Sequence, residues 1–300
     1  MDWIIFAFIT PAIYTISNYV DKYNLERQIK DYSIIPVYSS ITGLIIGTIF
    51  WCVNSFPTLN SNSTFLVLGS GILTTFAGVF YFKAISTEEV SKIIFFFQLQ
   101  PIMLLILARI ILHEDITLNQ IIGFLIVFLA VFCVSVKINK DTFKLTSGLI
   151  YIVIADFLAV IGTIMIKAAT NINSFPKILS YESWGIALGG LILVIFLPDI
   201  RSSFIKSTKE LKKSAIAIVF ISGIIFVIGK ITGYYAFSLG PVALVSVIIS
   251  TQVFYGIIYG LFLTLLFPSI FKEDISKQSL INKFIFMIIL LIGIFVISIK

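Results

Sequence analysis

The chain has 300 residues, of which 59% are hydrophobic and only 12% are charged, and its mean hydropathy is +1.08. Soluble domains carry about 25% charged residues, so this composition excludes a water-soluble fold and predicts a protein that spans a lipid bilayer. The net charge of +6 is typical of basic loops that face an anionic membrane leaflet, so no nucleic-acid partner is expected.

Ten apolar runs follow one another along the chain, and each has about the 20 residues that a spanning helix needs. They cover residues 3–20, 34–53, 65–85, 90–112, 118–136, 146–169, 178–197, 214–238, 241–267 and 280–299. The runs are continuous rather than alternating, which excludes a transmembrane β-barrel. The predicted fold class is an all-α membrane protein with ten transmembrane helices.

A short acidic turn occurs twice, each time after a long apolar run. The first is residues 111–117 (ILHEDIT) and the second is residues 270–276 (IFKEDIS). This repetition predicts two five-span units, residues 1–140 and 141–300. Five is an odd number, so the second unit must enter the membrane from the opposite face. We expect Glu114 and Glu273 to complement the dipole of the helix that follows each turn.

The charges of the connections are consistent with this inversion. Most of the 21 Lys and Arg residues lie after the first, third, fifth, seventh and ninth spans. By the positive-inside rule these connections face the cytoplasm and both termini lie outside. The connection after the second span, residues 54–64, has no charge, whereas its counterpart after the seventh span is the most basic of all.

Further motifs recur in the two units and carry a family resemblance. Glycines four apart, in the second and seventh spans, predict close helix packing; they are Gly43 with Gly47 and Gly185 with Gly189. In the first unit, an aromatic pair before a tight turn is followed by a Gln-Pro helix, an acidic turn and a Gln-x-x-Gly helix. These motifs are residues 81–84, Gln100-Pro101, Glu114 and residues 120–123.

This order of motifs resembles the EamA domain of the drug/metabolite transporter superfamily, and the resemblance covers the whole chain as two domains. It implies an inverted-repeat secondary transporter in the cell (inner) membrane. Such a protein would move a small metabolite, an amino acid or a drug-like solute by alternating access. The second unit departs from the pattern, because Val253 stands where the first has Pro101. The family is usually drawn with both termini in the cytoplasm, opposite to the charge distribution.

Two charged residues inside spans are the foremost candidates for substrate binding. Asp156 lies near the middle of the sixth span, where a charge costs about 2.5–3.5 kcal/mol, so it should face the bundle interior. It is a candidate proton or substrate site. Lys230 lies in the eighth span, and the two differ in depth by roughly 7 Å at 1.5 Å rise per residue. We expect a buried ion pair or a shared clamp, or else a Lys230 side chain that extends to the membrane surface.

Uncharged polar residues complete the predicted substrate site. Gln98 and Gln100 precede Pro101, which interrupts the fourth span and frees backbone carbonyls for a ligand. Gln252 occupies the equivalent stretch of the ninth span. Three further candidates lie in the first and third spans, namely Tyr14, Asn18 and Tyr81.

No catalytic residue, metal site or cofactor is expected. His113 is the single histidine, the two cysteines lie inside spans, and no phosphate-binding glycine loop occurs. The expected partners are a small-molecule substrate, the lipid bilayer and a coupling ion, a proton, with Gly256 and Gly260 offering a face for a homodimer. Two alternatives stay open: a membrane-embedded scaffold or sensor without transport, and a lipid-modifying enzyme.

Overall fold

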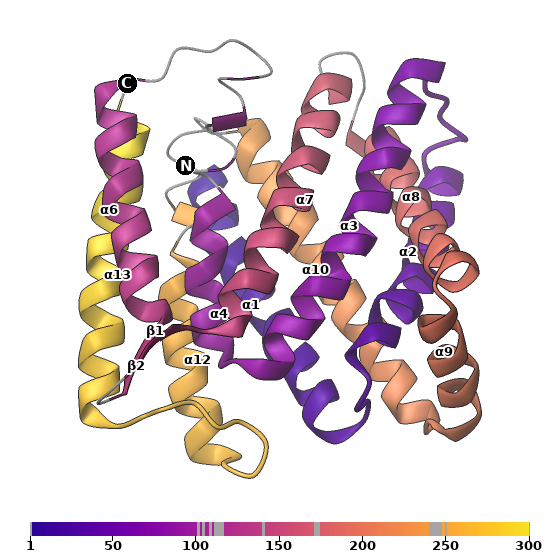
Figure 1. The fold of residues 1–300 in the computed structure, drawn as a ribbon. Coiled ribbons are helices and arrows are strands. Elements are labelled where there is room, and N and C mark those ends of the chain that lie inside the picture. Colours follow the sequence, from indigo (N-terminus) through magenta and orange to yellow (C-terminus); the bar gives the residue numbers. More distant parts are fainter. Residues whose placement is uncertain are drawn as a thin grey trace.

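The computed structural model describes residues 2–100, 103, 106–107, 110, 117–139, 142–170, 175–239, 248–249 and 251–299. These residues form a bundle of long helices that run side by side (Figure 1). In this part of the chain seven helices are long and apolar enough to cross a membrane. Three shorter apolar helices accompany them, at residues 90–99, 121–130 and 252–266. A multi-pass membrane protein is confirmed, and the count of ten spans stays a prediction.

The helices follow one another with short connections. In chain order they are α1 (Asp2–Arg27), η1 (Tyr32–Ile34), α2 (Ile35–Val53), α3 (Ser61–Thr87), α4 (Val90–Phe96), η2 (Phe97–Leu99), α6 (Leu118–Ser135), α7 (Ser147–Thr170), α8 (Phe175–Phe196), α9 (Pro198–Glu210), α10 (Lys213–Leu239), α12 (Gln252–Leu266) and α13 (Lys277–Ser298).

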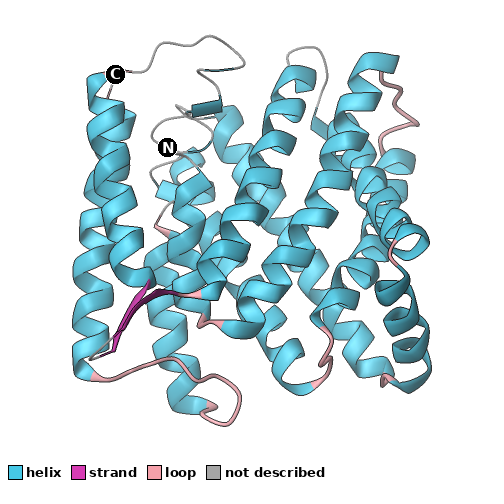
Figure 2. Ribbon diagram, viewed as in Figure 1, coloured by secondary structure: helices cyan, strands magenta, loops and turns pink. Residues whose placement is uncertain are grey.

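Three features differ from the expected elements. Helix α1 continues past Val20 to Arg27, so Asp21 lies inside it rather than in a loop. Strands β1 (Val136–Asn139) and β2 (Thr142–Leu145) form an antiparallel hairpin between α6 and α7 (Figure 2). Helix α9 fills a connection that was expected to be a loop. Its Pro198 at the first turn and its Lys209 in the last turn suit the two ends of a helix.

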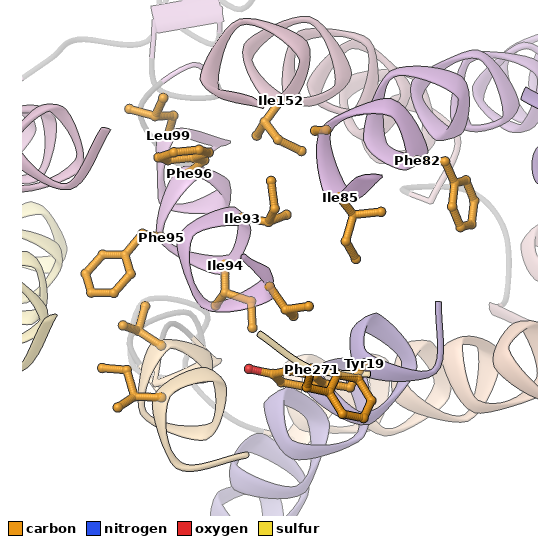
Figure 3. Packing of buried hydrophobic residues seen from close by; sticks show 14 of the residues in the cluster. Tyr19, Phe82, Ile85, Ile93, Ile94, Phe95, Phe96, Leu99, Ile152 and Phe271 are labelled. Carbon is orange, nitrogen blue, oxygen red and sulfur yellow. The ribbon is translucent and has the colours of Figure 1, made fainter. Parts of the chain in front are cut away.

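The long helices pack in pairs around a buried centre, and each pair joins one helix from the first half of the chain to one from the second half. Helix α1 lies along α10, α7 lies along α3, α2 lies along α8, and α6 lies along α13. After the polar residues of its first turn, the short helix α4 is apolar on every side and sits in the middle of the largest hydrophobic cluster, where its Ile93–Phe96 side chains are fully buried (Figure 3). A helix that is hydrophobic all round needs such a surrounding. The outer faces of α6 and α13 keep large apolar side chains exposed, as a lipid-facing surface requires.

The two predicted glycine motifs serve close helix packing. A Cβ on Gly47 of α2 would lie 2.8 Å from the carbonyl oxygen of Ser180 in α8. On the other side of α8, a Cβ on Gly185 would lie 2.9 Å from the carbonyl carbon of Leu68 in α3. Helix α8 is therefore held between α2 and α3 at distances that only glycine permits, as small-residue motifs do in lipid.

Replacing Gly71 by alanine is expected to destabilise the protein by about 1–3 kcal/mol, the usual cost of overpacking. The new Cβ would lie 2.6 Å from the backbone nitrogen of Ile186, and a backbone cannot move aside. Gly78→Ala in the same helix is the control, since its Cβ would meet only Pro36 at 3.7 Å. Thermal unfolding in detergent should separate the two variants, and equal melting temperatures would contradict this packing.

Different connections and termini of the chain lie at the two ends of the bundle. Both termini lie at one end, whereas the β-hairpin, α9 and the turn between α12 and α13 lie at the other (Figure 1). The connections after α1 and α3 lie at this second end as well. These are the basic connections, so their shared location agrees with the predicted topology. Which end faces the cytoplasm stays a prediction.

Candidate functional site

One face of α1 carries polar side chains along most of its length. Thr10, Tyr14, Ser17, Asn18 and Asp21 follow one another at steps of three or four residues, or lie side by side, so they share a helix face. We call this set the α1 polar face. It points into the bundle, because its members contact α3, α10 and α12. Polar groups that face the interior of a membrane bundle mark candidate substrate and ion paths.

Asp21 is the centre of a hydrogen-bond chain at this face. Its two carboxylate oxygens accept from the Tyr81 hydroxyl at 2.9 Å and from the Ser222 hydroxyl at 2.6 Å. The Asn18 amide donates to the Tyr81 oxygen at 2.9 Å, and the Gln252 amide donates to the Asn18 oxygen at 3.1 Å. The three predicted residues Asn18, Tyr81 and Gln252 are thus brought together in one network.

Asp21 and Ser222 were missed by the sequence analysis. The first apolar run ends at Val20, so Asp21 was assigned to a loop, although α1 continues to Arg27. A signal was present, because Asp21 lies three residues after Asn18 and seven after Tyr14, on the same helix face. Ser222 has no such signal, since a serine within an apolar span is common.

Asp156 forms a second buried contact, with Gln100. The Gln100 amide donates to Asp156 Oδ1 at 2.7 Å, and the Asp156 side chain is fully buried. Within the described part of the chain, the other carboxylate oxygen, Oδ2, has no hydrogen-bond partner. A buried acceptor without a donor is costly, so this oxygen is a place where a ligand would be stabilised. Gln98 does not join it, because its amide donates to the Ile94 carbonyl of its own helix at 3.2 Å.

The expected ion pair of Asp156 with Lys230 is not formed, whereas a shared substrate clamp stays a prediction. Lys230 Nζ lies 2.6 Å from Glu182 Oε1 of α8 instead, and this carboxylate is almost fully buried. The position of a residue along its helix axis sets its depth in the membrane but not the helix face that its side chain occupies. Glu182 was overlooked, although a lone carboxylate inside an apolar span is itself a signal. Tyr14 packs beside the pair, since a Cβ on Gly229 would lie 2.8 Å from the Tyr14 ring.

The Glu182–Lys230 pair predicts a measurable coupling. Glu182→Gln or Lys230→Gln alone leaves one charge unpaired in the bundle, and each is expected to cost about 3–5 kcal/mol of stability. The double variant removes both charges and should recover most of that loss. A double-mutant cycle on thermal unfolding measures the coupling free energy. Additive losses would mean that the two side chains do not interact.

A second polar cluster lies at the end of the bundle that carries the basic connections. We call Glu89, Glu273 and Lys283 the ionic cluster. Lys283 Nζ lies 2.7 Å from Glu89 Oε2 and 3.1 Å from Glu273 Oε2. Lys92 adds a contact of 2.8 Å to Glu89. The cluster joins the start of α4 to the turn that precedes α13 and to α13 itself.

Glu273 does not cap the helix that follows it, contrary to expectation. Its carboxylate accepts from the backbone N–H of Ser91 at 3.1 Å and from the Ser91 hydroxyl at 2.5 Å, so it caps α4. Helix α13 is capped by Ser276, whose hydroxyl accepts from the Ser279 N–H. The acidic turn folds inward because Lys283 and the first turn of α4 offer Glu273 three donors there. Glu114, in the other acidic turn, lies outside the described residues, as do His113 and Pro101.

The two carboxylates of the ionic cluster differ in their proton affinity. Burial raises the pKa of Glu89, but the adjacent Lys283 and Lys92 outweigh it and lower the pKa to about 2. Burial raises the pKa of Glu273 as well, and the attraction of Lys283 does not offset it, because Glu89 adds repulsion. Glu89 is therefore the ionised partner of Lys283, and Glu273 is the one that more readily takes up a proton.

The glycine motif of α12 is used within the chain. The Tyr19 hydroxyl donates to the Gly256 carbonyl at 2.8 Å, and a Cβ on Gly256 would lie 2.8 Å from Ile94 Cδ1. A Cβ on Gly260 would lie 2.5 Å from the Tyr19 hydroxyl oxygen. The motif therefore lets α1 and α4 approach α12, and it is not free to form the dimer face suggested by the sequence.

In the described part of the chain, no group of three or more His, Cys, Asp or Glu residues is placed to hold a metal ion. The chemistry that remains is that of carboxylates, amides and hydroxyls inside an apolar bundle.

Residues 1–136 match the model of the EamA-like transporter family. This first part of the chain, 136 of its 300 residues, is therefore similar to an EamA domain. The family's description is that of transporters, and the seven long apolar helices in the described part of this chain are those of a multi-pass membrane protein.

The remaining comparisons concern the fold alone. No curated protein sequence matches this chain. One solved crystal structure, described only as a protein, is similar over 100% of this chain and 99% of its own, with a TM-score of 0.56 and 12% sequence identity. The likeness extends across the whole chain, beyond the 136 residues matched by the family model.

Proposed function

We propose that this chain, whose residues 1–136 match the EamA-like transporter family, is a secondary transporter that moves a small polar solute by alternating access, as a multi-pass protein of the cell (inner) membrane. The observation that carries the proposal is the α1 polar face. It places a carboxylate, an amide and hydroxyls in the interior of a bundle whose outer surface is apolar. Burying so many polar groups is costly in lipid, and a solute path explains why they are there.

An inverted repeat of residues 1–140 and 141–300 is supported by reciprocal contacts. The first long helix of each unit packs against the third of the other, since α1 lies along α10 and α7 lies along α3. Polar contacts are reciprocal too. Asn18 in α1 meets Gln252 in α12, and Asp156 in α7 meets Gln100 beyond η2. Two units related in this way place a site between them, near the middle of the membrane.

The carboxylates of Asp156 and Asp21 suggest two different roles in transport. Asp156 has a buried oxygen with no hydrogen-bond partner among the described residues, so we assign it to the solute, as the acceptor for an ammonium group. Asp21 is half-buried and accepts only from neutral hydroxyls, so we assign it to the coupling proton. The charge of Lys230 is already neutralised by Glu182. When Asp156 is ionised, the interior therefore carries a net negative charge, which favours a cationic or zwitterionic amine, such as an amino acid, over an anion.

The ionic cluster provides a closure at one end of this path. It ties α4, from the first unit, to α13 and its preceding turn, from the second. Rocking of one unit against the other would have to break these contacts. We propose that the cluster forms when the path is closed at this end and opens when solute enters or leaves there.

Solute flux into proteoliposomes tests the proposal. Purified protein would be offered labelled cationic, zwitterionic and anionic amines and acids, with the pH gradient directed inward, directed outward or absent. Saturable flux of at least one amine, driven by the gradient and missing from empty liposomes, is expected. If none of the solutes moves or exchanges, the scaffold or sensor alternative is favoured instead.

A further inference from the structure

A groove of about 360 Å³ runs between α1 and α12 on the outside of the bundle. Its walls are apolar and include Ile16, Val20 and Tyr23 on one side and Phe262, Leu263 and Phe271 on the other. Ile16 is 42% exposed and Phe262 is 61% exposed, so the groove opens outward, where the bilayer lies. A hollow with an apolar lining is filled by hydrocarbon rather than by water.

Arg27 lies one helical turn beyond Tyr23, on the side of α1 that forms one wall of the groove. It continues the row of Ile16, Val20 and Tyr23, at the steps of three and four residues that keep side chains on one helix face. Its guanidinium reaches from α1 to the turn after α12, where Nη2 donates to the Ser269 carbonyl at 3.0 Å and to the Ser269 hydroxyl at 2.7 Å. The Arg27 side chain is exposed and bridges the two walls.

We propose that the groove binds an acyl chain of an anionic phospholipid whose phosphate is held by Arg27. A guanidinium has five donors in a planar fork that matches phosphate, and Ser269 engages only one of its nitrogens. Tyr23 lines the groove about one helical turn before Arg27. Tyrosine rings favour the headgroup level of a membrane, so the end with Arg27 lies where a phosphate would be.

A lipid chain bound in the groove would also help to hold the ionic cluster in place. Its inner wall is formed by Tyr19, whose ring meets Phe271 edge-on at a centroid distance of 5.6 Å (Figure 3). The Tyr19 hydroxyl lies 3.3 Å from Glu273 Oε1. A lipid chain that packs against Tyr19 and Phe271 therefore holds the two rings beside Glu273.

Native mass spectrometry of the purified, delipidated protein tests this site without reference to transport. The probes are dioleoyl phosphatidylglycerol and dioleoyl phosphatidylcholine, which share their acyl chains and differ in net charge. Phosphatidylglycerol adducts should exceed phosphatidylcholine adducts about fivefold, the factor that one basic residue at the surface contributes to binding of an anionic lipid.

Two variants at exposed positions separate the headgroup contact from the groove. Arg27→Gln should remove the preference for phosphatidylglycerol and leave phosphatidylcholine binding unchanged, whereas Arg201→Gln in α9, also exposed and at the same end of the bundle, should keep the preference. Ile16→Trp fills the groove and should lower adducts of both lipids, whereas Ile9→Trp, two turns away in α1, should not. A preference that survives Arg27→Gln, or lipid binding that is unchanged in Ile16→Trp, would overturn the proposal.

Discussion

Asp21→Asn is expected to abolish solute flux driven by a proton gradient while leaving solute exchange in place. The amide keeps the shape of the carboxylate but cannot take up a proton. Tyr81 and Ser222 can still hydrogen-bond to it, so the loss of stability should stay within about 1–3 kcal/mol. Proteoliposomes measure both properties: uptake against an imposed pH gradient, and exchange of labelled for unlabelled solute at equal pH on both sides.

Two further variants test whether the loss of proton-driven uptake is specific to Asp21. Asp156→Asn should lose uptake and exchange together, because the neutral amide no longer attracts an ammonium group. Asp199→Asn changes an exposed carboxylate of α9 and should behave like the unaltered protein. Uptake by Asp21→Asn at the unaltered rate would remove Asp21 from the coupling step and leave its network a structural role.

Lys283→Met is expected to destabilise the protein by about 3–5 kcal/mol at neutral pH, the cost of leaving buried carboxylates without their cation. Lys283 is the shared partner of Glu89 and Glu273, and its side chain is only 7% exposed. Lys277→Met, which removes an exposed lysine from the first turn of the same helix, should have little effect. Adding Glu273→Gln to Lys283→Met should recover part of the loss. Equal melting temperatures for the two lysine variants would show that the ionic cluster does not hold the fold.

The stability of the protein is expected to depend on pH through the carboxylates of the ionic cluster. The pKa of Glu89 is lowered from 4.5 to about 2, so its ionised form stabilises the fold above pH 4.5, and this contribution is lost as the pH falls toward 2. The pKa of Glu273 is raised, so its protonated form favours the fold at low pH and its ionisation costs stability as the pH rises above 4.5. In Lys283→Met, Glu273 loses its cation and Glu89 keeps only Lys92. The variant should therefore approach the unaltered protein in stability as the pH is lowered to 4.

The long helices could be predicted from the sequence because lipid demands continuous apolar runs. Helix α7 was expected at residues 146–169 and lies at Ser147–Thr170. The shorter elements could not. Helix α9 has too few apolar residues to stand out, and its buried side chain is Ile200 alone. The hairpin of β1 and β2 follows directly on an apolar helix, so hydropathy gives no boundary between them.

The candidate site was predicted in part, for a physical reason. Residue type identifies a polar group that must avoid lipid, which is why Asn18, Tyr81 and Gln252 were named and are found together. Residue type does not identify the partner, because that depends on how neighbouring helices are rotated. Lys230 was therefore assigned to Asp156, although it meets Glu182. Helix length matters in the same way, since ending α1 at Val20 concealed Asp21.

Water access along α1 tests the central claim most directly. Cys52 and Cys133 would first be replaced, and single cysteines would then be introduced at positions 14, 16 and 18 and treated with a charged, membrane-impermeant thiol reagent. Tyr14→Cys and Asn18→Cys lie on the α1 polar face and should react, and a transported solute should slow them. Ile16→Cys faces lipid and should not react, because a thiolate does not form there. Equal reactivity at all three positions, or reaction at position 16 alone, would contradict a polar path between the two units.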